Sequence, residues 1–251
     1  MAEHSVTEPD PVGGRAPGTE RRPMRLLLVN CNTSTATSER IRAVAQSVAA
    51  SSTTVEVATP EFGAERVVGF YDSFISAAAS LQVMARWRGR CDGVVMVGFG
   101  EHGREGARQL MDVPVVDITE AGMMAACLLG SEVGILATSD LVVGPVRESV
   151  AAMGLSSRLR GIHVAVGADP ADPATFVPAA QALLAGGADV IVLAGAGLLG
   201  VQEHLSRECG VPVVDPLTTA VTWCESLAHL SLTTSKHRDF RWEPGKAASL
   251  G

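Results

Sequence analysis

The chain has 251 residues, 47% of them hydrophobic, which is enough for a sizeable buried core. Its formal net charge is −7 and it has no lysine- or arginine-rich stripe, so a nucleic-acid partner is not expected. No apolar stretch reaches the roughly 18 residues of a membrane span, and the polar, acidic start is unlike a secretory signal. The five cysteines form no Cys-x-x-Cys pair, which favours reduced thiols and a cytoplasmic protein.

The order of elements predicts an α/β protein. Residues 1–23 are rich in Pro, Gly and charge, which predicts a disordered N-terminal extension. Residues 24–232 alternate short apolar runs with longer amphipathic ones, as in β/α units around parallel sheets. Strands are expected near 25–30, 54–58, 93–97, 114–116, 132–136, 162–166, 189–193 and 212–214. Helices are expected near 34–50, 73–88, 104–111, 119–129, 143–153, 173–186, 200–208 and 217–231. Residues 233–251 are polar again and predict a loose C-terminal tail.

An internal repeat divides the ordered part into two halves. CDGVVMVGFGEHG aligns with GADVIVLAGAGLLG, which pairs Gly98 with Gly195. VPVVDITEA aligns with VPVVDPLTTA, and RLLLVNCNTS aligns with EVGILATSD, in the same order along the chain. This repeat predicts two similar lobes with parallel-sheet cores, related by a pseudo-two-fold, with a ligand cleft between them. The first lobe would cover about 24–130 plus the C-terminal helix, and the second about 131–215.

Two glycine motifs raise the possibility of a dinucleotide site. GFGEHG and GAGLLG both fit Gly-x-Gly-x-x-Gly behind an apolar run, with Asp117 and Asp215 where a ribose-binding acid would stand. Three features argue against such a site. The first motif follows the third strand, Arg104 and Glu105 follow its last glycine, and a duplicated motif leaves no substrate domain. Tight strand-to-helix turns are the structural alternative, and we expect no NAD, NADP or flavin cofactor.

Seven segments together resemble a known enzyme family. They are VNCNTS, GFYDS, GFGEHG, VPVVDITEAG, EVGILATSD, AGAGLLG and TTSK. In this order they are similar to motifs of the aspartate/glutamate racemase superfamily, specifically its hydantoin/allantoin racemase branch. The resemblance runs from the first predicted strand to Lys236 and therefore covers nearly the whole ordered chain.

The resemblance implies an altered active site. Enzymes of that branch use two cysteines, one at a strand end in each lobe, to move a proton between two faces of a carbon beside a carbonyl. Gly98 and Gly195 stand at those two positions, so the usual two-cysteine racemisation is not expected. The loss of two side chains is expected to enlarge the cleft, and the glycine N–H groups could form an oxyanion hole.

The implied function is cofactor-free isomerase or lyase chemistry on a small carbonyl, imide or carboxylate compound, through an enolate-like state and without a metal. The superfamily includes decarboxylases that use a single cysteine, so partial loss of the proton-transfer pair already has relatives. Two alternatives remain open. One is a repurposed biosynthetic enzyme that guides a cyclisation or rearrangement, and the other is a non-catalytic pseudoenzyme that binds a small acid. A homo-oligomer is expected.

Strand-end residues are the candidate substrate-binding groups, because they reach a ligand held between the lobes. Hydroxyl, amide and helix N-terminal groups favour an anion, although N-capping would explain the hydroxyls equally well. The expected contacts are Asn32, Thr33, Ser34, Gly98, Phe99, Gly100, Thr138, Ser139, Gly195, Ala196 and Gly197. Tyr71, the only tyrosine, is expected either to contact the substrate or to pack.

Three further residues are the catalytic candidates. His102 titrates near neutrality and Glu101 beside it could orient it, so His102 is the expected proton-transfer group. Cys31 is the alternative, because a thiol beside a helix N-terminus can have a lowered pKa. The competing interpretations are a solvated turn for Glu101 and His102, and a small buried filler for Cys31. Glu120, placed after a strand, is expected to hold the hydrogen-bond frame of the cleft.

Overall fold

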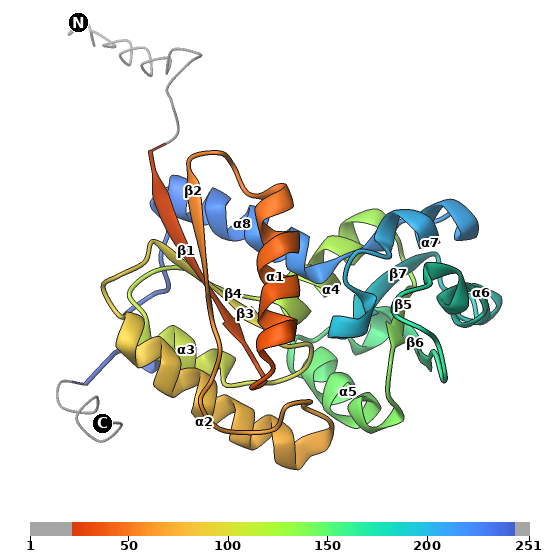
Figure 1. Ribbon diagram of the computed structural model, residues 1–251, viewed down its shortest axis with the longest axis horizontal. Helices are drawn as coiled ribbons and strands as arrows, with labels where there is room; N and C mark the ends of the chain where they lie inside the picture. The colour runs from red at the N-terminus through yellow and green to blue at the C-terminus, as the bar shows by residue number, and fades with distance from the viewer. Residues whose placement is uncertain (1–21, 244–251) are drawn as a thin grey trace, which may run out of the picture.

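The computed structural model describes residues 22–243, so nearly all of the predicted N-terminal extension lies outside the described residues. Two four-stranded parallel sheets form the two lobes (Figure 1). The first sheet, in the order β2-β1-β3-β4, contains β1 (Met24–Asn30), β2 (Thr53–Ala58), β3 (Gly93–Val97) and β4 (Val115–Asp117). The second, in the order β6-β5-β7-β8, contains β5 (Val133–Ala137), β6 (Leu159–Val164), β7 (Val190–Ala194) and β8 (Val213–Val214). The predicted two-lobed α/β fold is confirmed.

The predicted helices are also present in the described part of the chain. They are α1 (Thr35–Val48), α2 (Gly69–Trp87), α3 (Arg104–Leu110), α4 (Ile118–Leu129), α5 (Val143–Ala152), α6 (Val177–Ala185), α7 (Gln202–Cys209) and α8 (Pro216–His229). The start of α2 lies before the predicted residue 73, because the Asp72 carboxylate accepts a hydrogen bond from the Val68 N–H at 3.0 Å. Within residues 22–243, no helix is long and apolar enough to cross a membrane.

The strands read as continuous apolar runs because both faces of each sheet are covered. In β1, Leu26 and Leu28 pack with α1 and α8, whereas Leu27 and Val29 pack with α2 and α3 on the other face. The second sheet is covered in the same way, by α6 and α7 on one face and by α4 and α5 on the other. Each lobe is therefore a three-layer unit whose parallel strands end at the same edge.

The last helix of each half crosses to the sheet of the other half. Helix α8 follows β8 but places Leu217 and Val221 in the core of the first sheet, as expected for the C-terminal helix. Helix α4 follows β4, yet its Met123 and Ala126 belong to the core of the second sheet. The two helices pack closely, since a Cβ atom on Gly122 of α4 would lie only 2.9 Å from α8. The expected boundary near residue 130 therefore does not separate the two cores.

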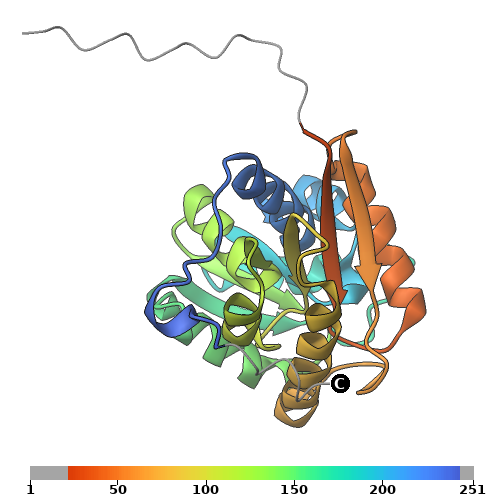
Figure 2. The same cartoon turned by 90° about the vertical axis from the view of Figure 1, so that its left-hand side faces the viewer.

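A loose C-terminal tail was predicted from residue 233. Up to residue 243, where the described residues end, this segment instead packs against the first lobe. It returns along the first lobe towards α3 (Figure 2). The Lys236 ammonium donates a hydrogen bond to the backbone carbonyl of Arg108 at 2.6 Å. Trp242 lies under the guanidinium of Arg88, 5.2 Å from the ring centre. These contacts hold a polar segment that has no hydrophobic periodicity of its own.

Candidate active site

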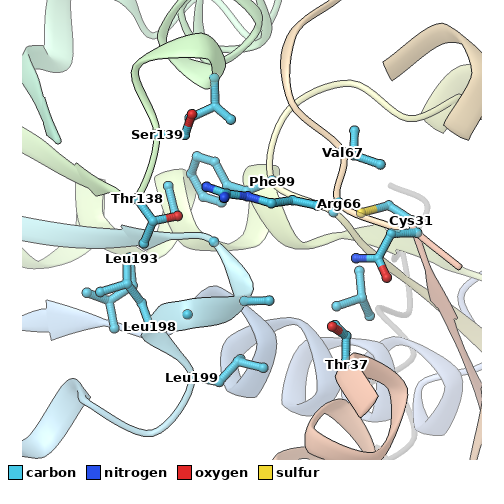
Figure 3. Close-up of a pocket in the computed structure, with 18 of the residues that line it drawn as sticks. Cys31, Thr37, Arg66, Val67, Phe99, Thr138, Ser139, Leu193, Leu198 and Leu199 are labelled. Carbon is cyan, nitrogen blue, oxygen red and sulfur yellow. The ribbon is translucent and has the colours of Figure 1, made fainter. Parts of the chain in front are cut away.

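A cavity of about 610 Å³ lies between the lobes, where the carboxyl ends of β1 and β3 face those of β5 and β7 (Figure 3). Most of the candidate residues lie on its wall, because parallel strands bring their carboxyl ends to one edge of each sheet. They are Cys31, Asn32, Ser34, Gly98, Phe99, His102, Thr138, Ser139, Gly195, Ala196 and Gly197.

Three candidates for substrate contact lie away from the cavity wall. The Thr33 N–H donates a hydrogen bond to the carbonyl of Ala64 at 3.1 Å. Tyr71 lies on the outer face of α2 and is 78% exposed, so it neither packs in a core nor reaches the cavity. The Gly100 N–H donates a hydrogen bond to the Thr119 hydroxyl at 2.8 Å, which leaves it no capacity for a ligand.

Glu101 does not orient His102, so this expectation is wrong. The Glu101 carboxylate accepts hydrogen bonds from the N–H groups of Gly103 at 2.7 Å and Arg104 at 2.9 Å, and it forms an ion pair with Arg104. It therefore caps α3. Gly103, with φ +91°, turns the chain into α3, where its own N–H and that of Arg104 meet the Glu101 carboxylate. His102 is 4% exposed, whereas the side chain of Glu101 is 41% exposed.

His102 and Cys31 fill the space beside Gly98. A Cβ atom on residue 98 would lie 2.3 Å from His102 Cδ2, 2.8 Å from His102 Nε2 and 2.6 Å from Cys31 Cβ. The cleft is therefore not enlarged at Gly98, in contrast to the expectation. Instead, the imidazole occupies the place that a side chain of residue 98 would take.

The opposite wall has a related arrangement at Gly195. This residue has φ +135°, a conformation that only glycine adopts easily, and a Cβ atom would lie 2.9 Å from Thr138 Oγ1. Here too a neighbouring polar side chain, that of Thr138, occupies the space into which a side chain at position 195 would project. The two walls of the cavity thus present an imidazole on one side and a hydroxyl on the other.

Burial sets the protonation states of the two titratable candidates. It lowers the pKa of His102 to about 4, so the imidazole is neutral at pH 7. Its Nδ1 atom has no hydrogen-bond partner among the described residues. Burial raises the pKa of the Cys31 thiol to about 12, and the negative charge of Asp117 adds to this effect. The expected lowered pKa of Cys31 is therefore wrong, and the thiol is protonated at neutral pH.

The polar side chains on the loops after β1 and β5 differ in which groups they leave free. Ser34 Oγ accepts from the Thr37 N–H at 3.3 Å, and Ser139 Oγ accepts from the Leu141 N–H at 3.3 Å, so both serine hydroxyls cap helical turns. Asn32 Oδ1 accepts from the Ser34 N–H at 3.0 Å. Within residues 22–243, the Asn32 amide NH₂ and the Thr138 hydroxyl form no hydrogen bond. These two groups are available to a ligand.

The two aspartates that fit the dinucleotide pattern are helix caps. Asp117 accepts hydrogen bonds from the first N–H groups of α4, and Asp215 accepts the equivalent bonds from α8. Both side chains are buried. Capping accounts for their position after each glycine motif without a ribose.

Sequence reasoning missed several charged residues around the cavity. Arg66 and Glu65 of the loop before α2 line it, as does Arg40 of α1. No motif marked the loop at residues 59–68, and its charged residues resemble those of any surface loop. Only the folded arrangement of β2 and α2 places this loop against the cavity.

Glu120 belongs to an ion-pair network behind the Gly98–Gly103 loop. Its carboxylate pairs with Arg104 at 3.3 Å and also with Arg108. Arg104 is only 3% exposed and also pairs with Glu105 at 2.8 Å. Together these pairs fix the start of α3 against α4.

The filled space beside Gly98 leads to a stability prediction. Gly98→Ala should lower the free energy of unfolding by about 1–3 kcal/mol, because its Cβ atom overpacks the site. Gly161→Ala is the matched control, since its Cβ atom has open space and an ordinary φ. In the His102→Ala background, the cost of Gly98→Ala should fall. Chemical denaturation of the double-mutant cycle measures this coupling, and strictly additive effects would contradict the packing described.

Comparison with known proteins agrees with this architecture. A family model described as Asp/Glu/Hydantoin racemase matches residues 26–224. The hydantoin racemase of Paenarthrobacter aurescens is 30% identical over 228 residues, which cover 87% of this chain and 97% of that protein. The crystal structure of allantoin racemase from Pseudomonas fluorescens is 37% identical, with a TM-score of 0.83 over 89% of this chain and 98% of that one. Arylmalonate decarboxylase, at 17% identity and a TM-score of 0.57 over 81% and 92% of the two chains, is similar in fold alone. The chain therefore belongs to the Asp/Glu/hydantoin racemase family.

Proposed function

We propose that this chain is a cofactor-independent enzyme that performs isomerase or lyase chemistry on a small carbonyl or carboxylate compound. In this proposal, Gly98 and Gly195 stand where related racemases carry the catalytic cysteines, and the reaction passes through an enolate-like state. The observation that carries the proposal is the position of His102, whose Nε2 atom lies 2.8 Å from where a residue-98 side chain would begin. A titratable group thus lies beside Gly98, one of the two positions that the proposal treats as catalytic.

The proposed chemistry uses His102 as the single base. A neutral imidazole removes the proton from a carbon beside a carbonyl, and the electron pair moves onto the carbonyl oxygen. The Thr138 hydroxyl and the Asn32 amide NH₂, which are both free, stabilise the oxygen as it becomes negative. The imidazolium then returns the proton to the same carbon or to an adjoining one. The Thr138 hydroxyl is too weak a base to act from the opposite wall, so two-base racemisation is not part of the proposal.

Two other functions use the same cavity. A repurposed biosynthetic enzyme would use the apolar wall to hold a substrate during a cyclisation or rearrangement. A non-catalytic relative would bind a small acid through Asn32 and Thr138 without turnover. The free groups on the two loops suit both alternatives, and only the titratable His102 at a proton-transfer position favours catalysis.

The proposal includes a cytoplasmic location and self-association. All five cysteines are free thiols, as expected in a reducing compartment. The N-terminal part of α2 exposes Phe70, Tyr71 and Phe74, of which Tyr71 and Phe74 are more than two-thirds exposed. Neighbouring aromatic side chains of this kind support an interface between copies of the chain. Sedimentation measurements on the full-length protein test this part.

The proposed function is tested by isotope exchange in deuterated buffer, followed by NMR. Suitable compounds are phenylmalonate, 2-phenylpropionate, maleate and enantiopure 5-benzylhydantoin. We expect deuterium incorporation or conversion with at least one carboxylate, and negligible racemisation of the hydantoin because a second base is absent. Binding of these acids without exchange or conversion would instead support the non-catalytic alternative.

A further inference from the structure

The loop between β2 and α2 brings a cation to the cavity. Residues 59–68 form this loop, and Arg66 is among its residues that line the cavity. The carbonyl of Ala64 accepts a hydrogen bond from the Thr33 N–H at 3.1 Å. This bond ties the loop to the segment that follows β1, so the backbone that carries Arg66 is fixed beside the cleft.

The guanidinium of Arg66 points across the cavity towards the wall that carries Thr138 and Ser139 (Figure 3). In the part of the chain that the structure describes, Arg66 forms no hydrogen bond or ion pair. Glu65 and Asp215 also line the cavity, but neither forms an ion pair with Arg66. A cation that is directed into a cavity without an internal partner is suited to an anionic ligand.

The facing wall supplies a second donor. Thr138 Oγ1 is adjacent to Gly195, as its 2.9 Å distance from a Cβ atom there shows, and it has no partner among residues 22–243. A carboxylate accepts up to four hydrogen bonds, so one such group can receive both a guanidinium and a hydroxyl. The geometry therefore favours a planar, bidentate acceptor between the lobes.

The rest of the wall is largely apolar. Side chains on the cavity lining include Phe99, Phe176, Leu193, Leu198 and Leu199. A volume of about 610 Å³ is in the range of sites for small organic ligands, which bury most of their apolar surface. The lining therefore suits a ligand with an apolar body attached to one anionic group.

We propose that the cavity takes an apolar carboxylic acid whose carboxylate binds the Arg66 guanidinium and the Thr138 hydroxyl. The carbon next to the carboxylate then lies in the space between Gly98 and Gly195. This proposal rests on the proposed function only in using the same cavity. It assigns to Arg66 the selection of acids over neutral carbonyl compounds such as hydantoins.

A matched pair of probes tests the assignment by calorimetry at pH 7. The probes are 2-naphthylacetate and 2-naphthylacetamide, which share the apolar body and differ in the charge of the head group. The unmodified protein should bind the acid at least about 10-fold more tightly than the amide. Arg66→Gln should weaken binding of the acid by about 10- to 100-fold and change binding of the amide by less than about 2-fold. The affinity of Arg66→Lys for the acid should lie between those of the unmodified protein and Arg66→Gln, because lysine keeps the charge but loses the bidentate geometry.

Arg90→Gln is the control for net charge, because Arg90 is exposed and does not line this cavity. It should leave both affinities unchanged. Equal affinity for acid and amide, equal weakening of both probes by Arg66→Gln, the same effect from Arg90→Gln, or no binding of either probe would each overturn the assignment.

The calorimetric result does not depend on turnover and is therefore separable from the proposed function. If the protein binds the acid selectively but converts none of the tested compounds, the result supports the carboxylate site and contradicts the catalytic proposal. Exchange on a neutral compound, unaffected by Arg66→Gln, would retain catalysis and overturn the carboxylate site.

Discussion

Replacing His102 with alanine should lower the rate of the chemical step by about 10²–10⁴-fold and change ligand affinity by less than about 2-fold. The imidazole stands beside Gly98 on the cavity wall, where it can reach a carbon held between the lobes. Asn32→Ala should behave differently, because it removes a group that binds the ligand and stabilises the developing negative charge, so it should weaken binding by roughly 10-fold and also lower turnover. His102→Ala thus separates turnover from binding, and Asn32→Ala does not. Steady-state kinetics with the substrate identified by isotope exchange provides the measurement.

The pH profile gives a second readout for His102. The base form of the imidazole is the neutral one, and burial lowers the pKa of His102 to about 4. The value of kcat/KM should therefore rise with pH through about 4 and stay level towards neutrality. His163→Ala serves as a control, because His163 is exposed on β6. Full turnover by both His102→Ala and Cys31→Ala would contradict the assignment and leave catalysis to the glycine backbone and the cavity shape.

Replacing Arg104 with alanine should lower the free energy of unfolding by about 3–5 kcal/mol, the usual cost of removing one partner from a buried ion-pair network. Arg104 is 3% exposed and pairs with Glu101 at 3.2 Å, Glu105 at 2.8 Å and Glu120 at 3.3 Å. Its charge also offsets part of the burial effect on Asp117. Without Arg104, the carboxylates of Glu120 and Asp117 lose this compensating charge.

The effect of Arg104→Ala should grow as the pH rises. Burial raises the pKa of Asp117 to about 7, so this carboxyl costs the folded state stability once the pH exceeds its unfolded pKa of about 4. Without the cation, its folded pKa rises further, and the loss extends above pH 7. Urea denaturation at pH 5 and pH 8.5 measures the difference. Arg22→Ala, which breaks the exposed pair with Asp92, should cost at most about 1 kcal/mol at both values. A pH-independent loss, or one no larger than that of Arg22→Ala, would refute the network.

The positions of the strands along the chain could be predicted because burial on both faces makes each strand a continuous apolar run. The repeat then placed Gly98 and Gly195 at equivalent strand ends, and parallel topology brought these ends to one cavity. The directions of the side chains beyond the strand ends depend on backbone torsion angles, which the sequence pattern does not reveal. Glu101 and His102 are adjacent, yet the Glu101 carboxylate accepts from the N–H groups of Gly103 and Arg104, whereas the His102 ring packs beside Gly98. Sequence spacing could not predict this separation.

The burial of Cys31 and His102 and the position of the β2–α2 loop could not be predicted from the sequence either. A cysteine near a helix start suggested a lowered pKa, but desolvation outweighs that effect for Cys31 in the cavity wall. The packing of His102 into the space beside Gly98 follows from the tight turn after β3 rather than from any spacing. Arg66 lies 32 residues before Gly98, and only the route of the β2–α2 loop brings it to the same cavity.

The crossing of α8 onto the first sheet determines when that sheet can finish folding during synthesis. The strands β1 to β4 are complete by residue 117, but α8, which covers one of their faces, begins only at residue 216. Until α8 has left the ribosome, Leu26, Leu28 and Val95 have only the partial cover that α1 gives on that face. The second sheet, in contrast, is synthesised after α4, which covers one of its faces. The half of the protein that is translated first is therefore the half whose core is completed last, and part of its apolar surface stays exposed until α8 has been made.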